Sequence, residues 1–127
     1  MKIKFWFNVI AAFVICFALS IYNFLPWWFF IFGNIFLVFI LKPKKQVSIW
    51  ANFGGVFLCW ICWAAFKDSD NSGLLSKKIS QIFYKSNNTQ ILYIITGIIG
   101  GIIGGLAGLT GYYLRCWIDE NKSTILE

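Results

Sequence analysis

Four long apolar runs, separated by short clusters of charge, constrain this chain more than any other feature. They cover about residues 5–22, 25–41, 47–66 and 91–114. A helix needs about 20 apolar residues to cross the roughly 30 Å hydrocarbon core of a bilayer. Backbone groups in lipid must be hydrogen-bonded within their own segment. The sequence therefore predicts an all-α, integral membrane four-helix bundle, in which the second span is the shortest.

The composition also indicates a bilayer as the solvent. Hydrophobic residues make up 59% of the 127 residues and aromatic residues 20%, which is more than a soluble domain of this size can bury. The start, MKIKFWFNVIAAFVICFALS, has the lysines and apolar core of a secretory signal, but no small-x-small cleavage site follows. We interpret it as an uncleaved first span and the whole of residues 1–127 as a single membrane domain.

The distribution of positive charge predicts the orientation. With both termini cytoplasmic, seven of the basic residues lie on the inner side and four on the outer side, as the positive-inside rule prefers. The charges form short clusters between spans and no basic face, so no nucleic-acid partner is expected. The abundance of Ile, Phe, Lys and Asn suits a bacterium with an AT-rich genome, so we expect a multi-pass protein of the bacterial inner (cytoplasmic) membrane.

The only sizeable extramembrane piece is the outer loop, residues 67–90. Within it, the apolar and polar residues of LLSKKISQIFY, positions 74–84, fall on opposite faces of a helix. Asn71 or Ser72 is placed to cap that helix. We expect a short helix on the outer membrane surface, which either bridges two spans or docks a partner. Its apolar face consists of Leu74, Leu75, Ile79, Ile82 and Phe83.

The fourth run contains a glycine strip, which we define as the seven glycines that share one helical face. They are Gly97, Gly100, Gly101, Gly104, Gly105, Gly108 and Gly111. In lipid, small residues let helix backbones approach closely, so the glycine strip predicts a packing surface. Its occupant is open: the other helices of the same chain, a second copy, or a different membrane subunit.

The sequence CWICW, positions 59–63, is the one motif of redox type, because Cys59 and Cys62 are one helical turn apart. The overall plan resembles that of the bacterial membrane disulfide-generating oxidoreductases, which are four-helix bundles with a membrane cysteine pair and a bound quinone. That family has a second cysteine pair in its loop, and the loop here has none. We favour a packing role for Cys59 and Cys62 and expect no cofactor.

The polar residues singled out inside the spans are Asn8, Asn34, Asn52 and Thr96, and none of these four is ionisable. Asn8 and Asn52 are at similar depth and are expected to bond across the first and third spans, while Asn34 needs a partner in mid-membrane. Histidine is absent, so no imidazole metal site or Cys–His pair can form. Lys67, Asp68, Asp70 and Asn71 form the best small polar cluster, with Asp68 expected to pair with Lys67 or cap the loop, and we predict no catalytic site.

The segment WAAFKDSDNSGLLSKKI, followed by ITGIIGGIIGGLAGLTGYYLR, resembles uncharacterised small four-span inner-membrane proteins of the Bacteroidetes. That resemblance implies no activity. We expect a non-enzymatic accessory or scaffold subunit of a larger complex of secretion, motility or respiratory type, packed through the glycine-rich fourth helix. Its partners would be the lipid bilayer and other membrane subunits or itself. The alternatives are a small channel, transporter or holin-like homo-oligomer, and an immunity or exclusion protein.

Overall fold

The computed structural model describes residues 2–22, 24–85 and 88–126, and within them the regular structure is entirely helical. Positions 86–87 of the expected outer loop lie outside these residues. The elements are α1 (Lys2–Ile21), the 3-10 turn η1 (Trp27–Phe29), α2 (Phe30–Leu41), α3 (Lys45–Asp70), α4 (Leu74–Tyr84) and α5 (Thr89–Leu126). The predicted helix at 74–84 is therefore present as α4.

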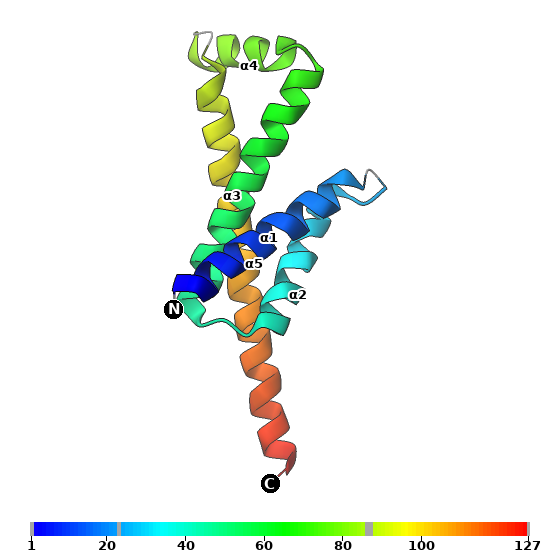
Figure 1. Ribbon diagram of the computed structural model, residues 1–127, viewed down its shortest axis with the longest axis vertical. Coiled ribbons are helices and arrows are strands. Elements are labelled where there is room, and N and C mark those ends of the chain that lie inside the picture. The colour runs from blue at the N-terminus through cyan, green and yellow to red at the C-terminus, as the bar shows by residue number, and fades with distance from the viewer. Residues whose placement is uncertain (1, 23, 86–87, 127) are drawn as a thin grey trace.

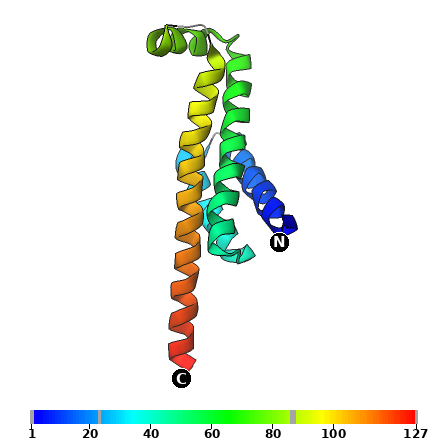
Figure 2. The same cartoon turned by 90° about the vertical axis from the view of Figure 1, so that its left-hand side faces the viewer.

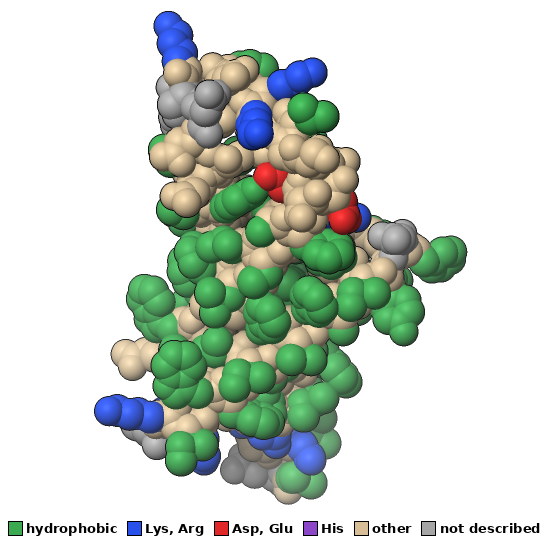
Figure 3. All heavy atoms as spheres, turned by 45° about the horizontal axis from the view of Figure 1, so that its top comes forward, with side chains coloured by type: hydrophobic (Ala, Val, Ile, Leu, Met, Phe, Trp, Pro, Cys, Tyr) green, Lys and Arg blue, Asp and Glu red, His purple; other side chains and the backbone are tan. Residues whose placement is uncertain are grey.

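Three of these helices, α1, α3 and α5, are long and apolar enough to cross a membrane, whereas the apolar segment Trp27–Leu41 is shorter. Figure 3 shows a broad apolar belt with basic side chains at both ends of the molecule. This is the surface expected of a chain whose middle is in hydrocarbon and whose ends are in water. The chain is thus built as a multi-pass membrane protein.

The long helices α3 and α5 form an antiparallel pair, and α1 and α2 form a hairpin that packs against it (Figures 1 and 2). Helix α1 contacts α3, and α2 contacts α5. Helix α4 lies across the ends of α3 and α5, roughly perpendicular to them. The turn of the α1–α2 hairpin ends well short of α4, so the two ends of the bundle have different shapes.

The helix ends follow from local backbone chemistry. Helix α2 ends at Lys42, whose φ of +51° reverses the chain before Pro43 and whose N–H donates to the Val38 carbonyl at 3.1 Å. The expected side-chain cap of α4 by Asn71 or Ser72 is wrong. Gly73 is the N-cap residue, and it has no side chain with which to make a cap bond. Its φ of +68° is a left-handed conformation that glycine adopts readily, and it turns the chain into the helix.

All seven residues of the glycine strip are buried, and the chain itself covers them. Helix α3 lies over Gly97 to Gly108 with side chains that include Trp60, Phe53 and Val56. Helix α2 lies over Gly111 through Ile35 and Val38. Of the three occupants left open by the sequence, the structure contains the first.

The packing of α1 on α2 and α3 also depends on close approach at glycines, here at single positions. Gly55 of α3 meets Ala12 and the Val9 carbonyl of α1, and Gly33 of α2 meets Ile15 and Leu19 of α1. Without a hydrophobic force between helices in lipid, stability depends on close dispersion contacts, which these glycines allow.

The expected hydrogen bond between Asn8 and Asn52 is wrong. Each of the three asparagines donates instead to the carbonyl four residues earlier in its own helix: Asn8 to Lys4 at 2.6 Å, Asn34 to Phe30 at 2.8 Å and Asn52 to Ser48 at 2.7 Å. The backbone carbonyl of the preceding turn is always within reach, so it outcompetes a partner on another helix. Helix α3 is joined to α5 by a buried hydrogen bond from the Ser48 hydroxyl to the Gly108 carbonyl, at 2.6 Å.

Helix α5 continues twelve residues beyond the end predicted for the fourth span, from 114 to Leu126. Arg115 marks the end of the apolar run, but a charge does not end a helix. Arg115 pairs with Asp119 one turn later at 3.3 Å, and no Gly or Pro follows to interrupt the backbone.

We predict that Gly108→Ala destabilises the bundle by about 1–3 kcal/mol, the usual cost of overpacking. A methyl group at Gly108 would lie 2.5 Å from the Ser48 carbonyl oxygen, which belongs to rigid backbone. Gly105→Ala, on the same helix, is the matched control, because its methyl would meet its nearest atoms at an ordinary 3.6 Å. Unfolding in mixed micelles with increasing SDS measures both, and equal stability of the two variants would contradict this packing.

Candidate functional site

The junction of α3, α4 and α5 is organised by one carboxylate, that of Asp68 at the end of α3. It accepts hydrogen bonds from the hydroxyls of Ser76 on α4 and Tyr93 on α5. Its backbone carbonyl accepts the Gly73 N–H at 2.9 Å. Three helices therefore meet at this residue, and α4 is attached through polar contacts.

The hydroxyl of Ser76, and then that of Tyr93, hold the pKa of Asp68 below its usual value, with a smaller contribution from the charge of Lys77. Asp68 is therefore ionised at neutral pH and acts as an acceptor, which does not suit a general acid or base. The expected pairing with Lys67 is wrong. The Lys67 ammonium lies instead over the ring of Trp63, 5.4 Å from its centroid, which is cation–π distance.

The predicted docking face of α4 is largely uncovered. Leu74, Leu75, Ile82 and Phe83 are exposed, the last two by 77% and 74%, and Ile79 is half-buried. The buried edge of the helix consists of Ser76 and Ser80. The helix therefore turns small polar side chains towards α3 and α5 and leaves its apolar face free, as expected of a helix on a membrane surface.

A cavity of about 420 Å³ lies between the turn of the α1–α2 hairpin and the α3–α5 pair; we refer to it as the hairpin cavity. Its volume is within the range of small-molecule sites, roughly 300–1,000 Å³. It is lined by Leu19, Ser20, Tyr22, Leu25, Pro26, Trp27, Phe30, Trp60, Trp63, Ala64, Lys67 and Thr96. A smaller hollow of about 140 Å³ under α4 contains Lys67, Asp68 and Asn71 of the predicted polar cluster but not Asp70.

The cysteines of the CWICW motif are separated. Cys59 is fully buried and Cys62 is exposed. Cys59 shares a buried cluster with Cys16 of α1, together with Phe30 and Val56. The proximity of Cys16 was not predicted, because no spacing rule connects positions on two different helices. Four free thiols are present: Cys16, Cys59, Cys62 and Cys116.

Within the described residues, no three side chains of the metal-binding types come together. Comparison with known protein families, with curated proteins and with solved structures gives no match to this chain. The site must therefore be interpreted from its own chemistry. That chemistry consists of an aromatic cavity, a lysine at its edge and a hydrogen-bonded carboxylate that anchors α4.

We predict that oxidation of the protein in its membrane with iodine forms a disulfide between Cys16 and Cys59 when Cys62 and Cys116 are replaced by serine. The two free thiols lie in one buried cluster, and iodine removes their two hydrogens as the sulfur–sulfur bond forms. Intact mass and loss of maleimide labelling after denaturation report the bond. The matched control keeps Cys16 and Cys62 and replaces the other two; equal cross-linking in the control would contradict the packing of α1 on α3.

We predict that Asp68→Ala releases α4, whereas Asp70→Ala, two residues away and exposed, does not. Hydrogen exchange of residues 74–84 in detergent should become several-fold faster only in the first variant. Because the pKa of Asp68 is lower in the folded protein, its contribution is complete above the ordinary pKa of about 3.9 and is lost as the pH falls below that value. Protection of α4 should therefore be constant from about pH 5 to 8, and a loss within that range would contradict this account.

Proposed function

We propose that the protein is a non-enzymatic accessory or scaffold subunit of a larger complex in the bacterial inner membrane, and that its partner docks on the free C-terminal part of α5. The observation that carries this proposal is the continuation of α5 as an amphipathic helix beyond the rest of the bundle. Assignment to proteins of the Bacteroidetes type belongs to the same proposal and rests on sequence resemblance alone.

We further propose four spans with both termini on the cytoplasmic side. The distribution of lysines supports this orientation. The segment Trp27–Leu41 has 15 helical residues, about 22 Å at 1.5 Å per residue. That length is less than the ~30 Å core, so the bilayer beside α2 must either thin locally or fill the space that the short helix leaves.

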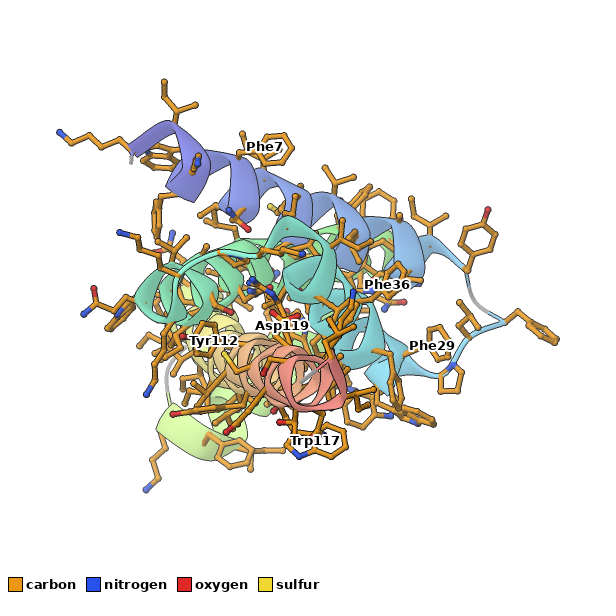
Figure 4. All side chains as sticks on the ribbon, turned by 90° about the horizontal axis from the view of Figure 1, so that it is seen from below. Phe7, Phe29, Phe36, Tyr112, Trp117 and Asp119 are labelled. Atoms are coloured by element: carbon orange, nitrogen blue, oxygen red, sulfur yellow. The ribbon has the colours of Figure 1, made fainter. Side chains whose placement is uncertain are left out.

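The docking surface is the C-terminal stripe, which we define as Leu114, Trp117, Ile118 and Ile125. At 100° per residue these four positions share one face, which also contains Asn121, while Arg115 and Lys122 flank it and Asp119 lies on the opposite side. Every described residue from Cys116 onward is exposed, Trp117 by 63% and Ile125 by 84%. Figure 4 shows Trp117 on the side of α5 that faces away from the other helices and Asp119 on the opposite side.

The exposed C-terminal part of α5 gains little stability from its own backbone hydrogen bonds, since isolated helices below ~12–15 residues are marginal in water. An exposed tryptophan with a leucine one turn before it and an isoleucine about two turns after it is typical of the apolar anchors that fill a groove on a partner. The absence of an ionisable residue inside the predicted spans and the ionised, fully hydrogen-bonded state of Asp68 favour a non-enzymatic role.

The glycine strip does not serve as this docking surface, because α3 and α2 cover it. The same coverage weakens the alternative of a channel or holin-like oligomer assembled through the strip. Such an assembly would have to displace Trp60, Phe53 and Val56 from the glycines first. The partner surface of the accessory subunit therefore lies at the end of α5.

We predict that the tagged protein, purified from its native membrane in mild detergent, carries a second, different subunit in stoichiometric amount. The variant Trp117→Ser, Ile118→Ser, Ile125→Ser should lose it, because the apolar anchors are removed. The matched control, Asp119→Ala, Glu120→Ala, Ser123→Ala, changes the opposite face and should keep it. Mass determination of the intact complex measures the subunit in wild type and in both variants. An oligomer of this chain alone, or retention of the second subunit by the serine variant, would contradict the proposal.

A further inference from the structure

We infer that the hairpin cavity binds one anionic phospholipid from the membrane leaflet on the α4 side, with the lipid chain in the cavity and its phosphate at Lys67. The inference rests on the cavity and its charge, and it is independent of any subunit partner. Its first support is position. The α1–α2 turn ends short of α4 (Figure 1), and the cavity is lined by residues of that turn and of the facing parts of α3 and α5.

The walls of the cavity suit a hydrocarbon chain. Phe30 is buried and packs edge-to-face on Trp60, with ring centroids 5.7 Å apart, which gives one side a fixed aromatic surface. Trp27 and Tyr22 of the hairpin turn are exposed at its rim, and these residue types favour the interface between lipid tails and headgroups. An empty apolar hollow forfeits dispersion contacts, so in a bilayer a lipid chain gains by filling it.

The polar chemistry of the cavity is concentrated in one cation. The hydroxyls of Ser20 and Thr96 donate to carbonyls of their own helices, those of Cys16 and Leu92, both at 2.8 Å. The Lys67 ammonium lies over Trp63 and makes no ion pair among the residues that the structure describes. The neighbouring carboxylate of Asp68 accepts from Ser76 and Tyr93. The ligand that fits has an apolar body and one anionic group at its end.

Charge selects the lipid class. Among the described residues that line the cavity, Lys67 alone is charged, and the α4 end of the molecule as a whole is net positive, with Lys77, Lys78 and Lys85 besides Lys67 against Asp68 and Asp70. A zwitterionic headgroup cancels its own phosphate charge, whereas an anionic headgroup does not. The site therefore prefers an anionic phospholipid to a zwitterionic one.

The test reconstitutes the full-length protein in nanodiscs of equal phosphatidylglycerol and phosphatidylcholine, then counts by native mass spectrometry the lipids that remain bound. Wild type should retain one phosphatidylglycerol, about fivefold over phosphatidylcholine, from the attraction of one lysine near the surface. Lys67→Gln should abolish that preference. Lys78→Gln makes the same change in net charge on α4, away from the cavity, and should preserve it.

A second variant tests the cavity without changing charge. Ala64→Phe fills it and should remove the retained lipid, while Lys67→Gln, an exposed substitution, gives a result even if Ala64→Phe does not fold. Three outcomes would each overturn the inference. They are equal retention of the two lipids by wild type, equal loss of the preference in Lys67→Gln and Lys78→Gln, and retention of the lipid by a folded Ala64→Phe. The C-terminal stripe is unchanged in every variant, so these outcomes are separate from those of subunit capture.

Discussion

The close approach of α3 and α5 along the glycine strip is the contact on which the rest of the structure depends. Lipid tails are as apolar as leucine, so two helices in a bilayer gain little from hiding apolar surface and must gain from contact itself. Gly104 and Gly108 let α3 come so near that its carbonyls at Asn52 and Ser48 face the strip directly. The Ser48–Gly108 hydrogen bond then fixes the register of the two helices at that point.

The other elements are positioned by that pair. Helix α1 reaches α3 at Gly55, and α2 reaches α5 at Gly111, so the hairpin packs on two helices whose spacing is already set. At one end, α4 connects the pair and is held by Asp68. At the other end, the Lys45 ammonium donates to the Tyr113 hydroxyl at 2.7 Å, which raises the pKa of Lys45 and ties the start of α3 to α5. From Cys116 onward every described residue of α5 is exposed, because the other helices end before this part of α5.

The apolar runs predicted where the helices lie, and the amphipathic pattern of 74–84 predicted α4, because both signals are local. The glycine pattern identified the packing face of α5 but not its occupant, since several bulky helices in the same chain are able to cover it. Other contacts join residues that are far apart in the sequence. Cys59 lies 43 positions from Cys16, Ser48 lies 60 positions from Gly108, and the more distant donor to Asp68 lies 25 positions away. The predicted bond between Asn8 and Asn52 was wrong because a local carbonyl competes with every distant partner, and Asn34 likewise finds its partner in its own helix.

The short second helix and the hairpin cavity have a common origin. Pro26 and the Lys42-Pro43 turn limit the helical segment between them to Trp27–Leu41, so the α1–α2 hairpin cannot extend as far towards α4 as α3 and α5 do. The bilayer must then either thin beside the hairpin or supply material to fill the space above it. A lipid whose headgroup is held by Lys67 would do the second, and would leave the thickness of the surrounding membrane unchanged. A space left by one short helix would bind a lipid if its lining carried a charge for the headgroup. Lys67 is part of that lining.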